Sequence, residues 1–200
     1  MTHDRRTTAA SAAVLLRAAR RSGRLTQEQL AQRTGLDQAR VSRSEHDQES
    51  PRFDTVDRLL SGSGHRLYAA PTRRDDAATA AVRIRTCLRR GDRHGALRNL
   101  IQLNDDLLGE KGLVRGVLAV TTPESTGEKV WDSAIAALVA WRLGQEHVPS
   151  PEWVDEPSRT LSRSRVLRVD VADPVPGRDD VPEEFLQHGV LVWRDTFGSV

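Results

Sequence analysis

The chain has 200 residues, enough for one large domain or for two small ones that each bury a modest core, and we predict two. Its single cysteine, Cys87, excludes an internal disulfide, and the short apolar stretch closed by Arg17 fits neither a secretory signal nor a membrane span. The formal net charge of +2 hides an asymmetry: residues 1–74 carry 14 basic and 8 acidic side chains, whereas residues 116–200 carry 8 and 14.

This charge distribution indicates that the N-terminal half of the chain binds a polyanion and that the C-terminal half does not. Ordinary variation of surface charge is the alternative. Arg5 and Arg6 belong to a Thr-rich start that either reaches a phosphate backbone or minor groove or is disordered. We expect a cytoplasmic protein with no membrane contact.

The first two predicted helices are joined by a short turn. Apolar residues recur at helical spacing over residues 10–22, and Gly23 ends that helix. Thr26 is a good N-cap, and Gln29, three residues later, completes the pattern of a capping box. A second helix is therefore predicted over residues 27–34.

A third helix follows a tight turn. Gly35 can take a positive φ without a Cβ clash, and Asp37 can cap a helix over residues 38–45 by accepting hydrogen bonds from its free N–H groups. Two short helices joined in this way, the second with polar outward residues, are typical of a helix-turn-helix unit. Its buried face is predicted to consist of Leu30, Ala31, Leu36 and Val41.

The fourth helix has its own start signals. Asp47 can adopt a left-handed turn, Ser50 can cap, and Pro51 suits a first helical position. Its apolar face is predicted to consist of Phe53, Val56, Leu59 and Leu60. The helix stops at the SGSG of residues 61–64, and the following HRLYAA, residues 65–70, could pair across a two-fold axis as a strand, a role that the next helices could equally serve.

A domain boundary is predicted at APTRRDD, residues 70–76, where proline and charges replace the apolar pattern. The fold class is therefore mainly α: a helix-turn-helix bundle of four to five helices at residues 1–72, connector helices at 73–112, and a small acidic α+β domain at 113–200.

The signals after residue 76 are weaker. We predict helices over residues 76–90 and 93–109, an ambiguous segment at 114–120, a helix behind a capping box of Ser125 and Glu128, and short strands at 166–169 and 189–193.

Four tryptophans lie in the back half: Trp131, Trp141, Trp153 and Trp193. They either build a small core or supply an exposed anchor for a partner, because tryptophan is enriched at binding hot spots. Trp153, with prolines on both sides, is the residue that we assign to partner binding.

No constellation for catalysis, cofactors or metals is recognisable. The six histidines lack metal-ligand spacing, and a glycine-rich phosphate loop and a serine elbow are both missing from the sequence. The carboxylate pairs Asp179–Asp180 and Glu183–Glu184 are typical of solvated loops, and Cys87 is typical of a small buried residue rather than a catalytic thiol. We expect a protein that is not an enzyme.

The third helix carries side chains suited to a major groove. Arg43 can donate two hydrogen bonds to guanine, Gln38 can pair with adenine, and the Ala39 methyl can touch a thymine methyl. The residues predicted to face bases are Gln38, Ala39, Ser42 and Arg43. Those predicted to contact phosphates, fixing register without discriminating sequence, are Thr26, Gln27 and Arg40.

LTQEQLAQRTGLDQARVSRSE, residues 25–45, resembles the XRE type of helix-turn-helix, the phage Cro and repressor family, and the resemblance extends over residues 12–68. It places that family's base-contacting positions on Gln38, Ala39 and Arg43, and its phosphate-contacting glutamine on Gln27. It implies a dimeric regulator on a partly palindromic double-stranded DNA operator.

Two positions depart from this pattern. Ser44 stands where the family usually has an aliphatic core residue, and His46–Asp47 replaces the usual basic residue and glycine, so the third helix is expected to be less firmly seated. The alternatives are a helical bundle with a solvated Arg- and Gln-bearing face, and a related module that binds protein and not DNA.

Residues 116–200 resemble the C-terminal part of actinobacterial XRE-type proteins that look like antitoxins beside a nucleotidyltransferase-type toxin gene. The segments that carry this likeness are STGEKVWDSAIAALVAW, PEWV and VPEEFLQHGVLVWRDTF. The resemblance implies an antitoxin and autorepressor whose toxin is encoded nearby. A ligand-sensing repressor without a protein toxin, and an interaction protein with incidental DNA binding, are the alternatives.

Overall fold

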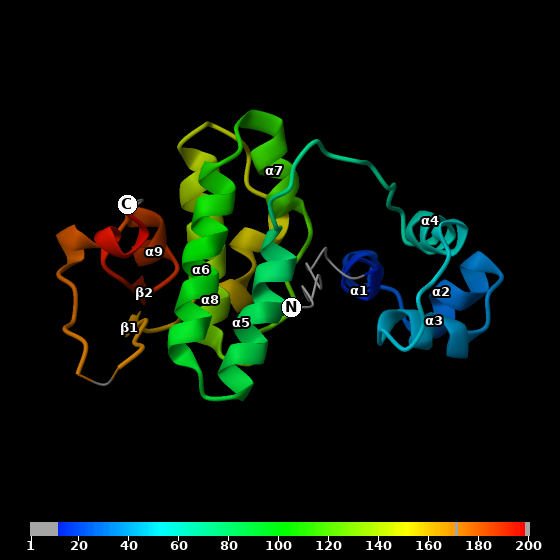
Figure 1. Cartoon of the computed structure of the whole chain (residues 1–200), viewed down its shortest axis with the longest axis horizontal. Helices are drawn as coiled ribbons and strands as arrows, with labels where there is room; N and C mark the ends of the chain where they lie inside the picture. The colour runs from blue at the N-terminus through cyan, green and yellow to red at the C-terminus, as the bar shows by residue number, and fades with distance from the viewer. Residues whose placement is uncertain (1–11, 171, 199–200) are drawn as a thin grey trace, which may run out of the picture. The chain divides into compact units, whose positions relative to one another are not determined.

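The computed structural model describes residues 12–170 and 172–198, which divide into two compact units on either side of the Ala70–Pro71 bond. Figure 1 labels the elements of both units. The described residues are mainly helical, as the sequence predicts. Among them, no helix is long and apolar enough to cross a membrane.

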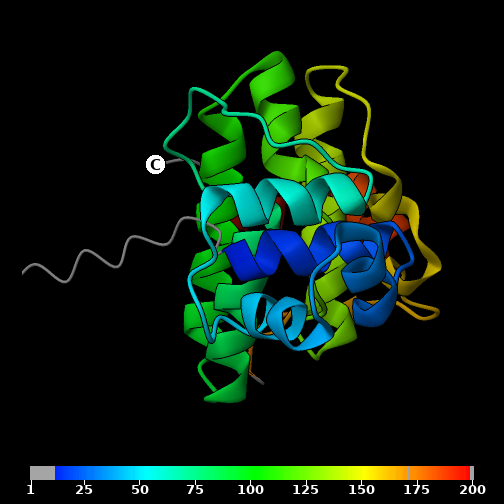
Figure 2. The ribbon, with the colours of Figure 1, turned by 90° about the vertical axis from the view of Figure 1, so that its right-hand side faces the viewer.

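The N-terminal unit consists of α1 (Ala12–Ser22), α2 (Gln27–Thr34), α3 (Gln38–Glu45) and α4 (Phe53–Gly62). In Figure 2, α1 and α4 lie side by side. Leu16, Leu30, Val41 and Leu59 of the shared core are each at most 1% exposed. The predicted bounds of α2 and α3 are confirmed.

Local hydrogen bonds explain where α2 and α3 begin. The Gln29 N–H donates to Thr26 Oγ1 at 3.1 Å, and the Thr26 N–H donates to Gln29 Oε1 at 2.8 Å, so the predicted capping box is present. Asp37 Oδ1 accepts from the Arg40 N–H at 2.7 Å. Gly35 ends α2 at φ 65°, a left-handed conformation that disfavours a Cβ.

The predicted start of α4 is wrong. The helix begins at Phe53, its N-cap is Arg52, and no side chain caps it, so neither Ser50 nor Pro51 has the expected role. The physical reason is the extended backbone of Arg52, at ψ 153°, which separates Pro51 from the helix. Phe53 is 68% exposed and not part of the core, because it occupies the first position of the helix.

The left-handed turn expected at Asp47 is present, with φ 57°. The apolar run at residues 65–70 forms no strand, and Tyr68 is 82% exposed.

The second unit is built around a buried helix. Its helices are α5 (Ala77–Arg89), α6 (Arg93–Leu108), α7 (Gly112–Val120), α8 (Lys129–Gly144) and α9 (Glu183–Gln187). Trp131, Ile135 and Leu138 of α8 are fully buried, and so is nearly every other residue of its first three turns. A helix that is apolar on all sides belongs in the centre of a core, and Figure 1 shows α5 and α6 beside it.

Short elements complete this unit. They are the 3₁₀ turns η1 (Glu152–Asp155), η2 (Pro157–Arg159), η3 (Arg178–Asp180) and η4 (Arg194–Phe197), and the strands β1 (Arg165–Val166) and β2 (Val190–Leu191). The two strands pair in parallel, Arg165 opposite Val190. β2 lies within the predicted 189–193, whereas β1 overlaps the predicted 166–169 only at Val166, and each strand has only two residues.

Two expectations for this unit are wrong. The helices expected as a separate connector, α5 and α6, bury Ile84, Leu100 and Leu107 in the same core as α8, so they belong to the C-terminal unit. Ser125 does not cap α8, because its hydroxyl donates to Asp132 Oδ2 at 2.6 Å, and the N-cap residue Glu128 makes no side-chain cap hydrogen bond.

Candidate nucleic-acid interface

The outward face of α3 carries the side chains that the sequence assigns to base contact. Gln38, Ala39 and Arg43 are exposed, and Ser42 is half-buried. Val41, on the opposite side of the helix, is fully buried in the core of the unit. The structure therefore places the four predicted base-contacting residues together on one solvent-facing side of a helix.

The angle between α2 and α3 depends on close packing at their crossing. Ala31 is only 4% exposed, and Leu36, between the helices, packs against the same core. Gly35 turns the chain within three residues. α3 is therefore presented at a fixed angle to the rest of the unit.

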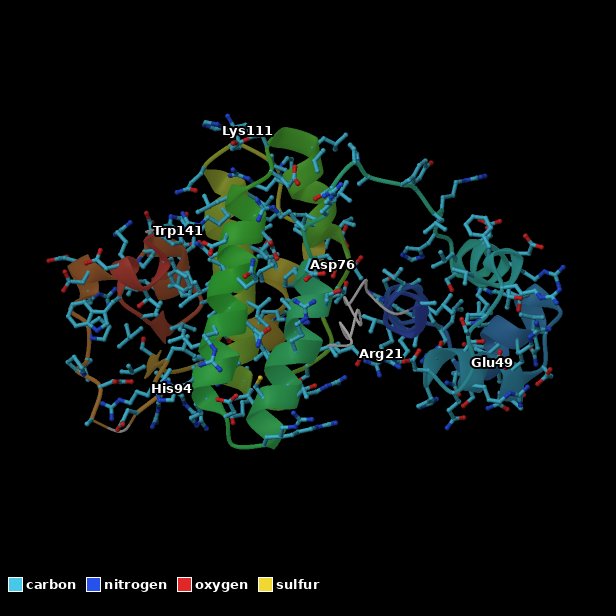
Figure 3. The ribbon with its side chains drawn as sticks, in the orientation of Figure 1. Arg21, Glu49, Asp76, His94, Lys111 and Trp141 are labelled. Carbon is cyan, nitrogen blue, oxygen red and sulfur yellow. The ribbon has the colours of Figure 1, made fainter. Side chains whose placement is uncertain are left out.

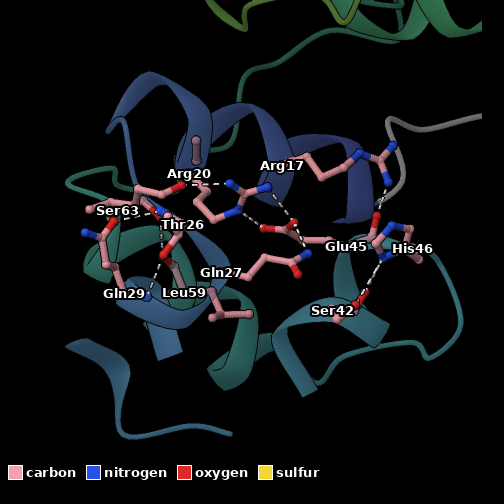
Figure 4. Close-up of polar contacts among 12 residues, drawn as sticks. Arg17, Arg20, Thr26, Gln27, Gln29, Ser42, Glu45, His46, Leu59 and Ser63 are labelled. Atoms are coloured by element: carbon pink, nitrogen blue, oxygen red, sulfur yellow. Dashed lines mark hydrogen bonds and ion pairs between the residues drawn. The ribbon is translucent and has the colours of Figure 1, made fainter. Parts of the chain in front are cut away.

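A buried ion pair ties the end of α3 to α1. Glu45 is 1% exposed, and its two carboxylate oxygens accept from Arg20 Nε at 2.7 Å and from Arg20 Nη2 at 3.0 Å. Arg17 donates to the backbone carbonyl of Glu45 as well. Figure 4 shows these contacts. Because a bidentate arginine fixes both position and direction, α3 cannot rotate about its axis without breaking the pair.

The same carboxylate orients Gln27, one of the predicted phosphate contacts. Gln27 Nε2 donates to Glu45 Oε2 at 2.9 Å, which leaves the second hydrogen of that amide for another acceptor. Thr26 is exposed, and its hydroxyl oxygen accepts from the Gln29 N–H, so the hydroxyl hydrogen can still be donated. Both side chains are held at the start of α2, and Gln27 reaches Glu45 at the end of α3 (Figure 4).

Glu49 is a residue of this site that sequence reasoning missed; it is labelled in Figure 3. Its Oε1 accepts from Ser44 Oγ at 2.8 Å, and its Oε2 accepts from Arg43 Nε at 3.3 Å. Arg40 Nε lies 4.0 Å from Oε1, and Arg40 Nη2 donates to Thr55 Oγ1 at 3.4 Å. The hydrogen bond from Ser44, ahead of the two arginines, lowers the pKa of Glu49 from 4.5.

The Glu49 contacts also explain the departure at Ser44. Its side chain is fully buried at a position where an aliphatic residue was expected, and its hydroxyl is satisfied by Glu49. Val41, Ser44 and Glu45 are all buried on the inner side of α3, so the serine is accommodated in the core together with a polar partner. A serine at a core position was the one signal in the sequence that a polar partner lies nearby.

His46 extends the outward face beyond the end of α3. It is exposed, and its Nδ1 lies 2.8 Å from the Ser42 carbonyl oxygen and 3.4 Å from Ser42 Oγ. A contact of 2.8 Å to a carbonyl requires that Nδ1 carries the hydrogen. Arg5 and Arg6 lie outside the described residues.

Trp153 is not the exposed anchor that the sequence suggested. It is 3% exposed, its Nε1 donates to the Ala119 carbonyl at 2.9 Å, and the Arg159 guanidinium lies 5.3 Å from its ring centroid. The reason is that η1 packs on α8 and directs this ring into the core of the C-terminal unit. Trp131 is buried too, whereas Trp193 is 38% exposed.

Residues 11–65 match a family model described as a helix-turn-helix domain, of the Cro and XRE-like type. This range contains α1 to α4, so the N-terminal unit is a helix-turn-helix domain, and such a domain supports a DNA-binding regulator. The match does not extend into the C-terminal unit. Comparisons with curated proteins and with solved structures gave no match.

Proposed function

We propose that the chain is a sequence-specific transcriptional regulator that acts in the cytoplasm as a homodimer on a partly palindromic DNA operator. The observation that carries this proposal is the outward row Gln38, Ala39, Ser42 and Arg43 on a helix whose inner side is fixed by Val41 and Glu45. Each protomer inserts α3 into a major groove, and a two-fold protein contacts half-sites about 34–36 Å apart.

The side chains of the site divide into two classes of contact. Arg43 donates to guanine O6 and N7, Gln38 pairs with adenine, and the Ala39 methyl lies against a thymine methyl. Thr26, Gln27 and Arg40 bind phosphates and fix the register of α3 in the groove. Arg40 is suited to this task because Thr55 already holds its guanidinium on the flank of α3.

Salt titrations of two variants test this division. Arg43→Ala should lose discrimination at one base pair of each half-site, by a factor of about five or more, because a good bidentate contact contributes about 1–3 kcal/mol. Arg40→Ala should weaken all sequences alike and reduce the slope of log K against log salt by about 0.9 for each phosphate that the variant no longer neutralises. Equal losses at every base pair for both variants would contradict the assignment.

A sharper form of the proposal makes the chain the antitoxin and autorepressor of a toxin–antitoxin pair. The acidic excess of residues 116–200 suits a basic, nucleotide-handling toxin, because complementary charge steers association. The C-terminal unit also exposes an apolar row on one face of α7: Leu113 at 83%, Val117 at 40% and Val120 at 63%. We place the toxin on this row.

Co-expression with the protein encoded by the neighbouring reading frame tests the antitoxin form. The two proteins should co-purify, and the double variant Leu113→Asp and Val117→Asp should lose the complex while keeping its DNA affinity. A neighbouring protein that never co-purifies, or one that binds this variant equally well, would refute it. If the complex forms but neither the complex nor the free chain binds DNA, the chain is instead an interaction protein.

A ligand-sensing repressor is the second candidate, and one cavity favours it. The C-terminal unit has a hollow of about 400 Å³, partly open to solvent, between the start of α6, the two strands and η4, and this volume is within the range of small-molecule sites. Its lining includes Leu97, Val166, Leu191 and Trp193, with His94 and Asp173 as polar groups. This candidate predicts operator release by an apolar small molecule and no stable protein partner, which titration of the operator complex would detect.

A further inference from the structure

We propose that Glu49 is a specificity-determining residue, which positions Arg43 so that its two terminal amino groups face the guanine edge. This inference rests on the proposed function and adds a residue outside α3 to the groups that select the operator. It is carried by the contacts of the carboxylate with Ser44, Arg43 and Arg40.

The carboxylate of Glu49 is anchored from the inner side of α3. Ser44 is fully buried, and its hydroxyl donates to Oε1 at 2.8 Å. Because a buried serine cannot follow a mobile carboxylate, this bond fixes the acid at the end of the turn after α3. The Glu49 side chain itself is 29% exposed, so it reaches the surface from a held position.

The other oxygen of Glu49 then directs Arg43. Oε2 lies 3.3 Å from Arg43 Nε, the guanidinium nitrogen that is bonded to the aliphatic part of the side chain. An arginine has five N–H groups, so occupation of Nε leaves the four hydrogens of Nη1 and Nη2 for a partner. Guanine O6 and N7 are a pair of acceptors that two arginine N–H groups can bind at the same time. The Arg43 side chain is 47% exposed, which leaves that end accessible.

Glu49 also influences Arg40, the predicted phosphate contact. Arg40 Nε lies 4.0 Å from Oε1, so the Glu49 carboxylate lies near two guanidinium groups, those of Arg40 and Arg43, which are three residues apart on α3. An acid at this place repels the phosphate backbone, which weakens binding to every sequence. Glu49 therefore lowers general affinity and raises discrimination, a combination that favours the correct operator over bulk DNA.

The test uses the full chain and two duplexes: the preferred sequence selected from a random library, and the same duplex with the Arg43-contacted base pair exchanged. Affinities for both are measured by fluorescence anisotropy at several salt concentrations. Glu49→Gln should bind both duplexes more tightly but reduce their affinity ratio about fivefold, a part of the discrimination that one bidentate contact supplies. Ser44→Ala should reduce the ratio too, because the carboxylate loses its anchor.

Asp47→Asn is the matched control. Asp47 is exposed two residues before Glu49, and the substitution removes the same charge. It should tighten binding to both duplexes and keep their ratio. In an Arg43→Ala background, Glu49→Gln should change the ratio no further, because the arginine that it positions is absent.

The outcomes separate this inference from the proposed function. If the wild-type chain enriches no sequence, the proposed function fails, and the inference falls with it. If a sequence is enriched and Arg43→Ala relaxes it, but Glu49→Gln behaves like Asp47→Asn, the role of Glu49 is refuted and the proposed function stands. Thermal unfolding of each variant shows whether a loss arises from unfolding.

Discussion

At the scale of single residues, the N-terminal unit relies on two carboxylates with different surroundings. Glu45 is 1% exposed and is bound by Arg20 and Gln27, whereas Glu49 is partly exposed and is bound by Ser44 and Arg43. A buried ion pair contributes little to stability relative to apolar packing, but removal of one partner leaves an uncompensated buried charge. The two acids should therefore respond differently to substitution.

Arg20→Ala should destabilise the N-terminal unit by about 3–5 kcal/mol, because Glu45 would stay buried without its counter-charge. Arg58→Ala, at an exposed position of α4, is the control and should change the free energy of unfolding by less than about 0.5 kcal/mol. Urea unfolding followed by circular dichroism measures both. Equal effects of the two substitutions would show that the pair does not hold α3.

The lowered pKa of Glu49 gives its contribution to stability a definite pH dependence. An acid whose pKa is lower in the folded state stabilises that state above its ordinary value of 4.5, and this stabilisation is lost as pH falls through the lowered pKa. The difference in unfolding free energy between wild type and Glu49→Gln should be constant near neutral pH and shrink below pH 4.5. A difference that grows on acidification would contradict the contacts described for this carboxylate.

At the scale of elements, the presentation of α3 depends on small residues where helices meet. Ala31 of α2 is 4% exposed in the core that α2 shares with α3, and Gly62 of α4 packs so closely on α2 that an added Cβ would meet Thr34 Cγ2 at 2.4 Å. Gly35, at φ 65°, has open space around it, so its requirement is conformational and not steric. The docking angle therefore tolerates little extra volume at the first two positions.

Ala31→Leu should overpack the crossing, destabilise the unit by about 1–3 kcal/mol and abolish operator binding under conditions where the chain stays folded. Gln32→Leu adds an apolar side chain at the exposed neighbouring position and should leave both properties nearly unchanged. Anisotropy at a temperature well below the unfolding midpoint separates lost geometry from lost folding. Normal DNA binding by folded Ala31→Leu would show that the crossing angle is unimportant.

Features that depend on local interactions were predictable from the sequence, whereas features that depend on contacts between distant elements were not. The starts of α2 and α3 were predictable because Thr26, Gln29 and Asp37 act within their own first turns. Glu49 was missed because its contact with Ser44 depends on which side of α3 is turned toward the core. Trp153 was misassigned because flanking prolines do not reveal that η1 packs on α8.

At the scale of the whole molecule, the chain divides at a segment without helix or strand, residues 65–76. All four tryptophans belong to the C-terminal unit, at positions after residue 130. Tryptophan fluorescence therefore reports that unit alone, whereas circular dichroism reports the helices of both. This separation allows each unit to be followed in the intact chain.

Within the described residues, limited trypsin digestion of the intact chain should cut first at Arg66, Arg73 or Arg74, which are exposed in that segment. The two products should resist further cleavage, because helices protected by a core are cut only after local opening. Mass spectrometry of early time points identifies the sites. First cleavage within α5 or α6 would contradict the assignment of those helices to the C-terminal core.

The measurement that tests the central claim most directly is selection of bound duplexes from a random DNA library by the wild-type chain and by Arg43→Ala. The wild type should enrich a two-fold symmetric sequence whose half-sites lie about 34–36 Å apart. The variant should enrich the same sequence without its preference at one base pair of each half-site. Identical sequences from both proteins, or no enrichment by the wild type, would contradict the assignment of α3 to base recognition.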